Sequence, residues 1–125
     1  MLLVVVSSGA KAEWLAVDEN DVAVAYIDLA TIIKNGNILN MWSMADLKTA
    51  KLDSIGPYKS IKSQVEIDCK EYKSQMHTAF FYSGHMSGGN EILSADLTSP
   101  EWKPIEPKTF FDALWKVACK NQWSF

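Results

Sequence analysis

The chain has 125 residues, of which 48% are hydrophobic and 22% are charged, and its formal net charge is −3. This length and composition suit one globular domain with a buried core and exclude wholesale disorder. All 12 basic residues are lysines, so the chain has no guanidinium group for recognising phosphate or guanine, and nucleic-acid binding is not expected.

The first twelve residues, MLLVVVSSGAKA, predict a truncated signal peptide. An apolar run at 2–6 precedes small residues, and the Ala-Lys-Ala sequence at 10–12 fits the small-x-small rule for cleavage. The single mature domain is then expected at 13–125, exported to the periplasm, secreted or held at the cell surface. No cysteine follows the apolar run, so no lipid anchor is expected, and no stretch is long enough to span a membrane. The alternative is that 2–6 forms a first β-strand.

The N-terminal half of the domain predicts strands. A short apolar run at 14–17 precedes a polar turn, and 22–29 (VAVAYIDL) is rich in β-branched and aromatic residues, which predicts a strand. Asn35 and Gly36 are a strong hairpin signal, because both central residues of a type I′ turn need a positive φ. The partner strand is expected at 38–45.

The middle of the chain continues this pattern. A polar stretch at 48–57 ends in Gly-Pro and is expected to be a loop before a strand at 58–69. Further strands are expected at 76–83 and 92–95, joined by a glycine-rich turn. Three prolines within 97–109 make that stretch unsuited to a central strand or a helix interior.

The last segment predicts a helix that ends near Lys120. Thr109 and Asp112 resemble a capping box. Apolar residues then recur on one helix face, namely Phe111, Leu114, Trp115, Ala118 and Cys119. Strands followed by one helix predict an α+β domain, an antiparallel β-sheet of about six strands with the C-terminal helix packed on it. The alternative is an all-β barrel in which the last segment is irregular.

The two cysteines predict one disulfide. Alternation along 65–69 places Cys69 on the apolar face of its strand, and Cys119 lies on the apolar stripe of the helix. In an exported chain, two cysteines directed into one core are expected to be linked. Free buried thiols would suit a cytosolic protein instead. A catalytic thiol would need His77 or His85 as its base, and a zinc site would need four ligands at spacings that do not occur.

No motif predicts catalysis, a cofactor or a metal site, so the domain is expected to be non-enzymatic. Glu66 and Asp68 share a strand face, but such a pair is far commoner on a solvated surface than in acid–base catalysis. The Met-His pairs at 76–77 and 85–86 are of types that bind copper. Neighbours on a strand point to opposite faces, however, so at most one residue of each pair would converge on a site.

A local basic cluster is the candidate for contact with a partner. Its members are Tyr58, Lys59, Lys62, Lys70, Tyr72 and Lys73. Such a cluster predicts contact with an acidic protein or glycan, and the commoner alternative is a solvated strand face. The strand at 38–45 carries large apolar side chains on both faces. This predicts cover on both sides or a subunit interface, and hence a homodimer.

An ordered set of segments spans the whole predicted mature domain. It comprises Trp14, 26–36 (YIDLATIIKNG), Trp42, 58–69 (YKSIKSQVEIDC), 81–89 (FYSGHMSGG), 101–107 (EWKPIEP) and Cys119. In this order the segments resemble the bacterial surface-adhesin protein E family. The resemblance implies an exported, non-enzymatic, disulfide-linked sheet with a C-terminal helix, often dimeric, that binds host extracellular-matrix or serum proteins. The founding adhesin of this family is lipid-anchored, and the leader of this chain departs from that pattern.

Two other functions remain open at this point. One is a periplasmic inhibitor or envelope-stress protein, whose loop at 83–90 would plug the cleft of a bacterial enzyme. The other is a periplasmic metal-binding protein that uses the Met-His pairs.

Overall fold

The computed structural model describes residues 12–54, 56–96 and 101–120. Except for Ala12, the predicted signal peptide lies outside these residues, as does the alternative strand at 2–6. The elements in chain order are β1 (Trp14–Glu19), β2 (Ala23–Asp28), the 3₁₀ turn η2 (Leu29–Thr31), β3 (Ile33–Asn35), β4 (Ile38–Asp53), β5 (Gly56–Asp68), β6 (Lys73–Tyr82), the 3₁₀ turn η3 (His85–Ser87), β7 (Glu91–Asp96), β8 (Lys103–Pro104), α1 (Phe110–Trp115) and the π-helical turn η4 (Lys116–Lys120).

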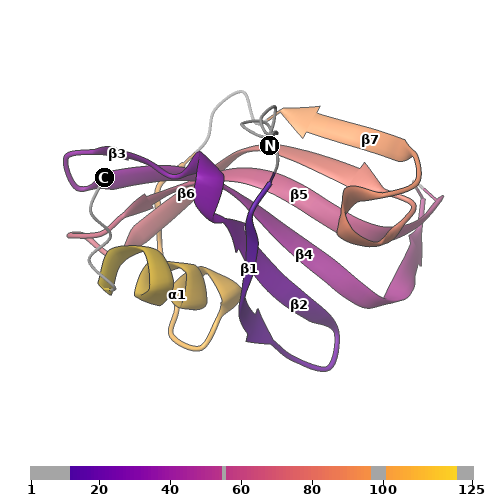
Figure 1. Ribbon diagram of the computed structural model, residues 1–125, viewed down its shortest axis with the longest axis horizontal. Helices are drawn as coiled ribbons and strands as arrows, with labels where there is room; N and C mark the ends of the chain where they lie inside the picture. The colour runs from indigo at the N-terminus through magenta and orange to yellow at the C-terminus, as the bar shows by residue number, and fades with distance from the viewer. Residues whose placement is uncertain (1–11, 55, 97–100, 121–125) are drawn as a thin grey trace, which may run out of the picture.

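The described strands form one antiparallel sheet of eight strands, with the helix beside it (Figure 1). The order is β1-β2-β4-β5-β6-β7, with β3 added to β4 and β8 added to β6. The predicted α+β architecture is confirmed. The all-β alternative is wrong, because the last segment is helical and not irregular. The sheet has two strands more than the predicted six. These are β3 and β8, which are only three and two residues long. β8 contains a proline, which is tolerated at such a peripheral position.

The hairpin turn lies one residue later than the sequence predicts. Asn35 pairs directly with Ile38, so the two turn residues are Gly36 and Asn37. Gly36 has φ +65° and Asn37 is not among the positive-φ residues, so the turn is not type I′. The turn therefore joins β3 to β4, while β2 lies along a later part of β4.

The loop predicted at 48–57 is wrong, because β4 continues to Asp53 and β5 begins at Gly56. The pairing of the two strands shifts register between Asp46 and Lys51. Lys48, Thr49 and Lys51 are exposed there, so their polarity reflects contact with water and not a lack of strand pairing. Polar composition alone does not separate a loop from a solvent-facing ribbon.

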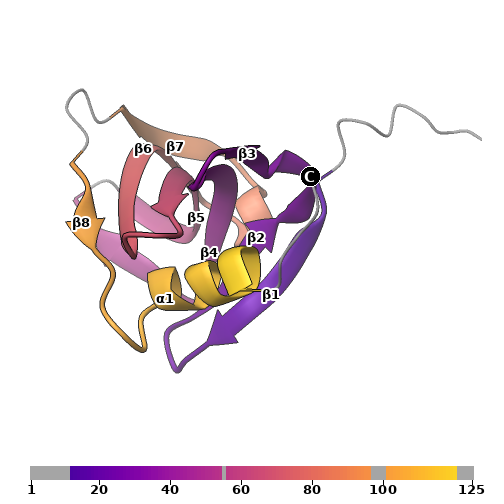
Figure 2. The ribbon, with the colours of Figure 1, turned by 90° about the vertical axis from the view of Figure 1, so that its left-hand side faces the viewer.

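The main core lies between the sheet and the helix. Its buried members are Ile27, Leu39, Met41, Val65, Ile67, Ile105, Leu114 and Ala118. Figure 2 shows the sheet curling so that α1 lies on its concave side. Val65 and Ile67 are fully buried opposite Met41 and Leu39 of β4, which confirms the predicted inward face of β5.

The predicted disulfide is confirmed. Cys69 and Cys119 are bonded, with their Cα atoms 5.6 Å apart and a sequence separation of 50. The indole Nε1 of Trp115 donates a hydrogen bond to the Cys69 carbonyl at 3.2 Å. The end of β5 is therefore joined to the helical segment by one covalent and one polar link, and the sulfurs are neither free thiols nor zinc ligands.

The helix begins with the predicted cap. The Asp112 N–H donates to Thr109 Oγ1 at 3.2 Å. The Asp112 carboxylate, in a residue only 4% exposed, accepts from the Tyr72 hydroxyl at 2.7 Å and from the Lys108 N–H at 3.0 Å. Lys116 Nζ lies 3.2 Å from the same carboxylate. Asp112 therefore ties the start of the helix to the β5–β6 turn.

We expect this carboxylate to make the stability depend on acid. The hydrogen bond from Tyr72, followed by that from the Lys108 N–H, holds the pKa of Asp112 below its ordinary value. A lowered carboxyl pKa stabilises the fold above the unfolded-state pKa, and this contribution disappears as pH falls through the folded-state pKa, below about pH 4. The same bond raises the pKa of Tyr72, so alkali releases it only above the ordinary tyrosine range.

Urea unfolding at a series of pH values checks this expectation, with Asp112→Asn as the matched variant. The difference in unfolding free energy between the native chain and the variant should be largest near neutral pH and should shrink in acid. A difference that stays constant from neutral pH down to strong acid would contradict the assigned role.

Candidate binding surface

The predicted basic cluster does not form one patch. Lys59 lies near the start of β5, Lys62 lies in its middle, and Lys70 and Lys73 follow its end. A strand rises about 3.3 Å per residue, so Lys59 lies roughly 30 Å from the end of β5 at Asp68, beyond which Lys70 follows in the turn. The Lys62 ammonium lies 5.0 Å from the ring centre of Trp42. The positive charges of the four lysines are therefore spread along β5 and the turn after it, and they do not form one concentrated patch.

Both tyrosines of that cluster are engaged inside the protein. Tyr58 is only 5% exposed and packs edge-on against Phe81, with 5.1 Å between ring centroids, so its expected surface position is wrong. Its large ring is buried in a second, smaller core cluster, where it removes more apolar area from water than it would at the surface. Tyr72 packs edge-on against Trp115 at 4.9 Å and donates its hydroxyl to Asp112.

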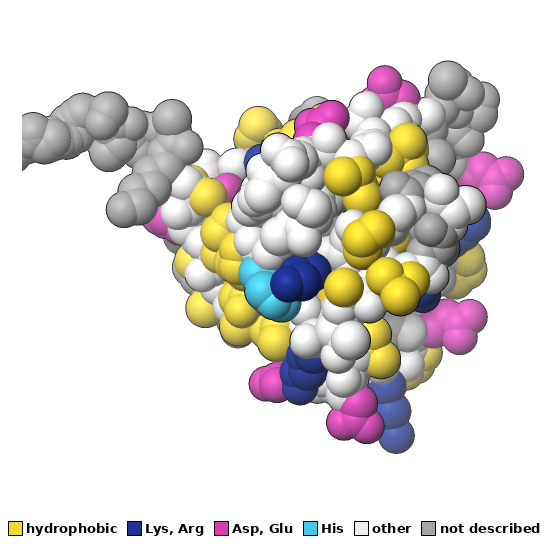
Figure 3. Space-filling model, turned by 90° about the vertical axis from the view of Figure 1, so that its right-hand side faces the viewer, with side chains coloured by type: hydrophobic (Ala, Val, Ile, Leu, Met, Phe, Trp, Pro, Cys, Tyr) yellow, Lys and Arg dark blue, Asp and Glu magenta, His cyan; other side chains and the backbone are white. Residues whose placement is uncertain are grey.

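Figure 3 views the end of the molecule that holds the β4–β5 hairpin and η3. Hydrophobic side chains adjoin one another along the left of this view and are scattered elsewhere, and the lysines stand apart from one another. Leu52 is 76% exposed on this hairpin. This end therefore shows no basic patch.

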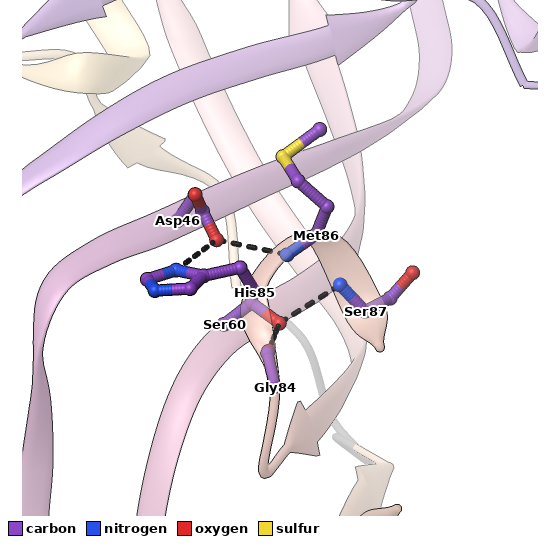
Figure 4. Close-up of polar contacts among 6 residues, drawn as sticks. All are labelled: Asp46, Ser60, Gly84, His85, Met86 and Ser87. Carbon is purple, nitrogen blue, oxygen red and sulfur yellow. Dashed lines mark hydrogen bonds and ion pairs between the residues drawn. The ribbon is translucent and has the colours of Figure 1, made fainter. Parts of the chain in front are cut away.

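The glycine-rich segment 83–90 is fastened to β5 by a buried serine (Figure 4). Ser60 has no exposed surface. Its Oγ donates to the Gly84 carbonyl at 2.6 Å and accepts from the Ser87 N–H at 2.9 Å. One hydroxyl thus satisfies a donor and an acceptor of the loop backbone.

An aspartate of β4 fastens the same loop at a second place. Asp46 Oδ1 accepts from the Met86 N–H at 2.8 Å and lies 3.2 Å from His85 Nδ1 (Figure 4). The side chain of Asp46 is 17% exposed, whereas that of His85 is 51% exposed. The Asp–His pair suggests part of a catalytic triad, but the Ser60 hydroxyl is already bonded to the loop backbone.

The loop backbone has little room to change. Met86 and Ser87 have positive φ values of 53° and 58°. A Cβ on Gly84 would lie 2.8 Å from the Gly88 carbonyl carbon, so the two glycines allow the loop to close on itself. The loop that the inhibitor hypothesis would use is therefore a preformed structure bound against β4 and β5.

Planar polar side chains cross the outer face of the sheet, which is the face opposite the helix. The register aligns Asn40 of β4 with Glu66 of β5, and Glu66 with Gln75 of β6. Gln64 Nε2 donates to Asn40 Oδ1 at 3.2 Å. Glu66 Oε1 accepts from Gln75 Nε2 at 2.7 Å and lies 2.7 Å from His77 Nε2. We call these five residues the outer-face ladder.

A β-bulge directs His77 into this ladder. Gln64 pairs with Thr78 and Val65 pairs with Met76, so His77 is the extra residue between two paired positions. Met76 packs against the main core. The two members of this Met-His pair therefore serve different sides of the sheet. Among the described residues, no group of three or more histidines, cysteines or carboxylates is arranged to hold a metal ion.

The ladder keeps Glu66 ionised. Partial burial raises the pKa of Glu66, but the hydrogen bonds from His77 and then Gln75, together with the charge of His77, outweigh it and lower the pKa. The carboxylate is thus available as an acceptor at neutral pH.

A hollow of about 460 Å³ lies beside the ladder. Its lining residues are Ile33, Asn35, Ile38, Asn40, Gln64, Glu66 and Trp102. We call it the outer-face hollow. Asn40, Gln64 and Trp102 were not predicted as site residues, although alternation along β4 and β5 places Asn40 and Gln64 on the outer face.

Comparisons with known proteins agree with this fold. The family model described as surface-adhesin protein E matches residues 14–120. No curated protein sequence matches the chain. A crystal form II structure of Haemophilus influenzae protein E is similar with a TM-score of 0.61 at 17% identity, covering 88% of this chain and 98% of that one. Protein E from non-typeable Haemophilus influenzae gives a TM-score of 0.63 at 16% identity, covering 90% and 78%. At such identities the likeness of structure shows the fold alone.

Proposed function

The chain belongs to the surface-adhesin protein E family, and we propose from this membership that it is an exported, non-enzymatic domain that binds a host extracellular-matrix or serum protein. The observation that carries the proposal is the family match over 14–120, which includes both cysteines of the disulfide. Disulfides persist in oxidising compartments, which supports export. No helix of the described residues is long and apolar enough to cross a membrane.

We propose that the mature domain is 13–125, and the contacts of Glu13 support this start. The Glu13 N–H donates to Asp28 Oδ1 at 2.9 Å, and the Glu13 carbonyl accepts from the Leu29 N–H at 2.9 Å. Glu13, the first residue after the proposed cleavage position Ala12, is thus already bonded to the end of β2 and to the residue that follows it. N-terminal sequencing of the exported protein should begin at Glu13, and a start inside β1 would refute this cleavage site.

Equilibrium binding to immobilised vitronectin and laminin tests the proposed function. The oxidised domain should bind at least one of them saturably and should not bind serum albumin. Lys59 and Lys62 lie in β5, whereas Lys70 lies in the turn after it and Lys73 begins β6, so the two double alanine variants should weaken binding unequally. If the folded, oxidised domain binds neither matrix protein, the proposed function fails.

We also propose a homodimer. β1 and β7 end the strand order, and Leu15 and Leu93 on them are 38% and 39% exposed. An edge strand has unpaired backbone N–H and C=O groups with which a second copy of the chain can pair, and such a contact would also bury part of these leucines. Light scattering should give twice the chain mass, and the mass of a single chain at high concentration would refute the dimer.

A further inference from the structure

We propose that the outer-face hollow binds a neutral saccharide. This inference rests on the proposed function, because it names the class of ligand that the binding domain holds at one defined place. The hollow is formed by β3, β4 and β5 together with Trp102. Its volume of about 460 Å³ lies within the usual range for small-ligand sites, roughly 300–1,000 Å³.

The walls of the hollow suit the C–H faces of a sugar ring. Trp102 is 39% exposed and Ile33 is 66% exposed, and both line the hollow. An indole ring offers a flat apolar surface together with an N–H donor. A sugar also has an apolar face bounded by hydroxyl groups, so one Trp wall can contact the ring while polar groups reach its edge.

The polar groups of the hollow suit sugar hydroxyls, which both donate and accept hydrogen bonds. The bond from Gln64 to Asn40 and the bond from Asn40 to Glu66 fix both amides, and together they use one N–H of each amide and the oxygen of Asn40. An ionised carboxylate has about four acceptor sites, and Gln75 and His77 both approach Oε1 of Glu66. Donors and acceptors therefore remain side by side on rigid strands.

Other classes of ligand fit less well. The described lining residues include one carboxylate and no lysine, and His77 is already paired with Glu66 at 2.7 Å, so a sulfated, sialylated or phosphorylated ligand would meet a carboxylate whose cationic partner is taken. A purely apolar ligand would cover the amides without replacing their bonds to water. One carboxylate with three amides is also a poor set for a divalent cation, which prefers several charged oxygen ligands.

The sequence itself is unusual for a solvated strand face. Asparagine is depleted in strands, yet Asn40 lies in the long central strand β4 between β3 and β5. Glu66 stands in register beside it and Gln64 is hydrogen-bonded to it, where threonine would suit the strand better. Local choices that oppose strand propensity are expected at functional sites.

Titration of the ¹⁵N-labelled, oxidised domain by NMR tests the inference. The probes are maltotriose, cellotriose, lactose and N,N′-diacetylchitobiose, each at millimolar concentration. At least one should shift the indole signal of Trp102 and the side-chain amide signals of Asn40 and Gln64. Trp102→Ala and Asn40→Leu should each lower the affinity for that saccharide by about tenfold, as expected for the loss of one well-made contact.

The controls separate binding from folding. Leu52→Ala removes an exposed apolar side chain, 76% exposed on the β4–β5 hairpin and outside the hollow, and should leave affinity unchanged. Asn40→Ser keeps a small polar group, so it should remain folded and still bind more weakly. A heparin tetrasaccharide should not shift the three signals.

Three outcomes would overturn the inference. None of the four saccharides shifts the three NMR signals, Trp102→Ala binds the saccharide with the same affinity as the native chain, or heparin binds at these residues in preference to the neutral saccharides. The proposed function is tested separately. If vitronectin or laminin binds the native chain and both hollow variants equally while the saccharides fail, the saccharide site is wrong and the adhesive function stands. If a saccharide binds while neither matrix protein does, the saccharide site stands and the adhesive function is wrong.

Discussion

Cys69→Ser and Cys119→Ser are each expected to lower the free energy of unfolding by about 4 kcal/mol, and by equal amounts, because both remove the same cross-link. The disulfide closes a loop with a sequence separation of 50, and in the chain-entropy description this restricts the unfolded chain. A small domain is stable by only about 5–15 kcal/mol, so either variant should unfold at a much lower denaturant concentration.

Urea or guanidinium unfolding of the oxidised protein and the variants measures this effect. The double variant is the decisive control, since it should lose no more than either single variant. Losses that add, or that differ by more than about 1 kcal/mol between the two cysteines, would show that packing and not the cross-link supplies the stability.

Ser60→Ala is expected to have the second-largest effect, a loss of about 1–3 kcal/mol. The substitution removes the hydroxyl that serves the Gly84 carbonyl and the Ser87 N–H, and alanine supplies no replacement. Because the loop is also held by Asp46, the damage should be concentrated in 83–90.

Unfolding curves combined with amide hydrogen exchange test this second prediction. The Ser87 amide should exchange much faster in Ser60→Ala, while amides near Val65 should change only with global stability. Ser94→Ala, at an exposed serine of β7, is the matched control and should be nearly neutral. Unaltered exchange at Ser87 would mean that Ser60 does not fasten the loop.

The features that follow from local periodicity were predictable. Alternation along β5 indicates the direction of Cys69, and the helical period indicates the direction of Cys119. Once the helix packs on the sheet, the two side chains face one another and can form the disulfide. The cap at Thr109 was predictable because its partner, the Asp112 N–H, lies three residues away.

The features that depend on long-range contacts or on register were not predictable in this way. The bonds from Ser60 to Gly84 and from Met86 to Asp46 join residues 24 and 40 positions apart, with no local pattern to mark them. The bulge at His77 inserts one residue into β6, which alternation cannot foresee. The burial of Tyr58 was not predicted because tyrosine is intermediate in burial and occurs both on surfaces and in cores.

We propose that the outer face of the sheet binds the partner, whereas the packing of the helix against the other face stabilises the domain. Hydroxyl-radical footprinting of the oxidised domain, with and without the matrix protein that it binds, separates the two faces. Trp42 and Trp115 are both half-buried, and they lie on the outer face and the helix side respectively. We predict protection of Trp42 and Trp102 with oxidation of Trp115 unchanged. Protection of Trp115 with Trp42 and Trp102 unaffected would place the partner on the helix side and refute this proposal.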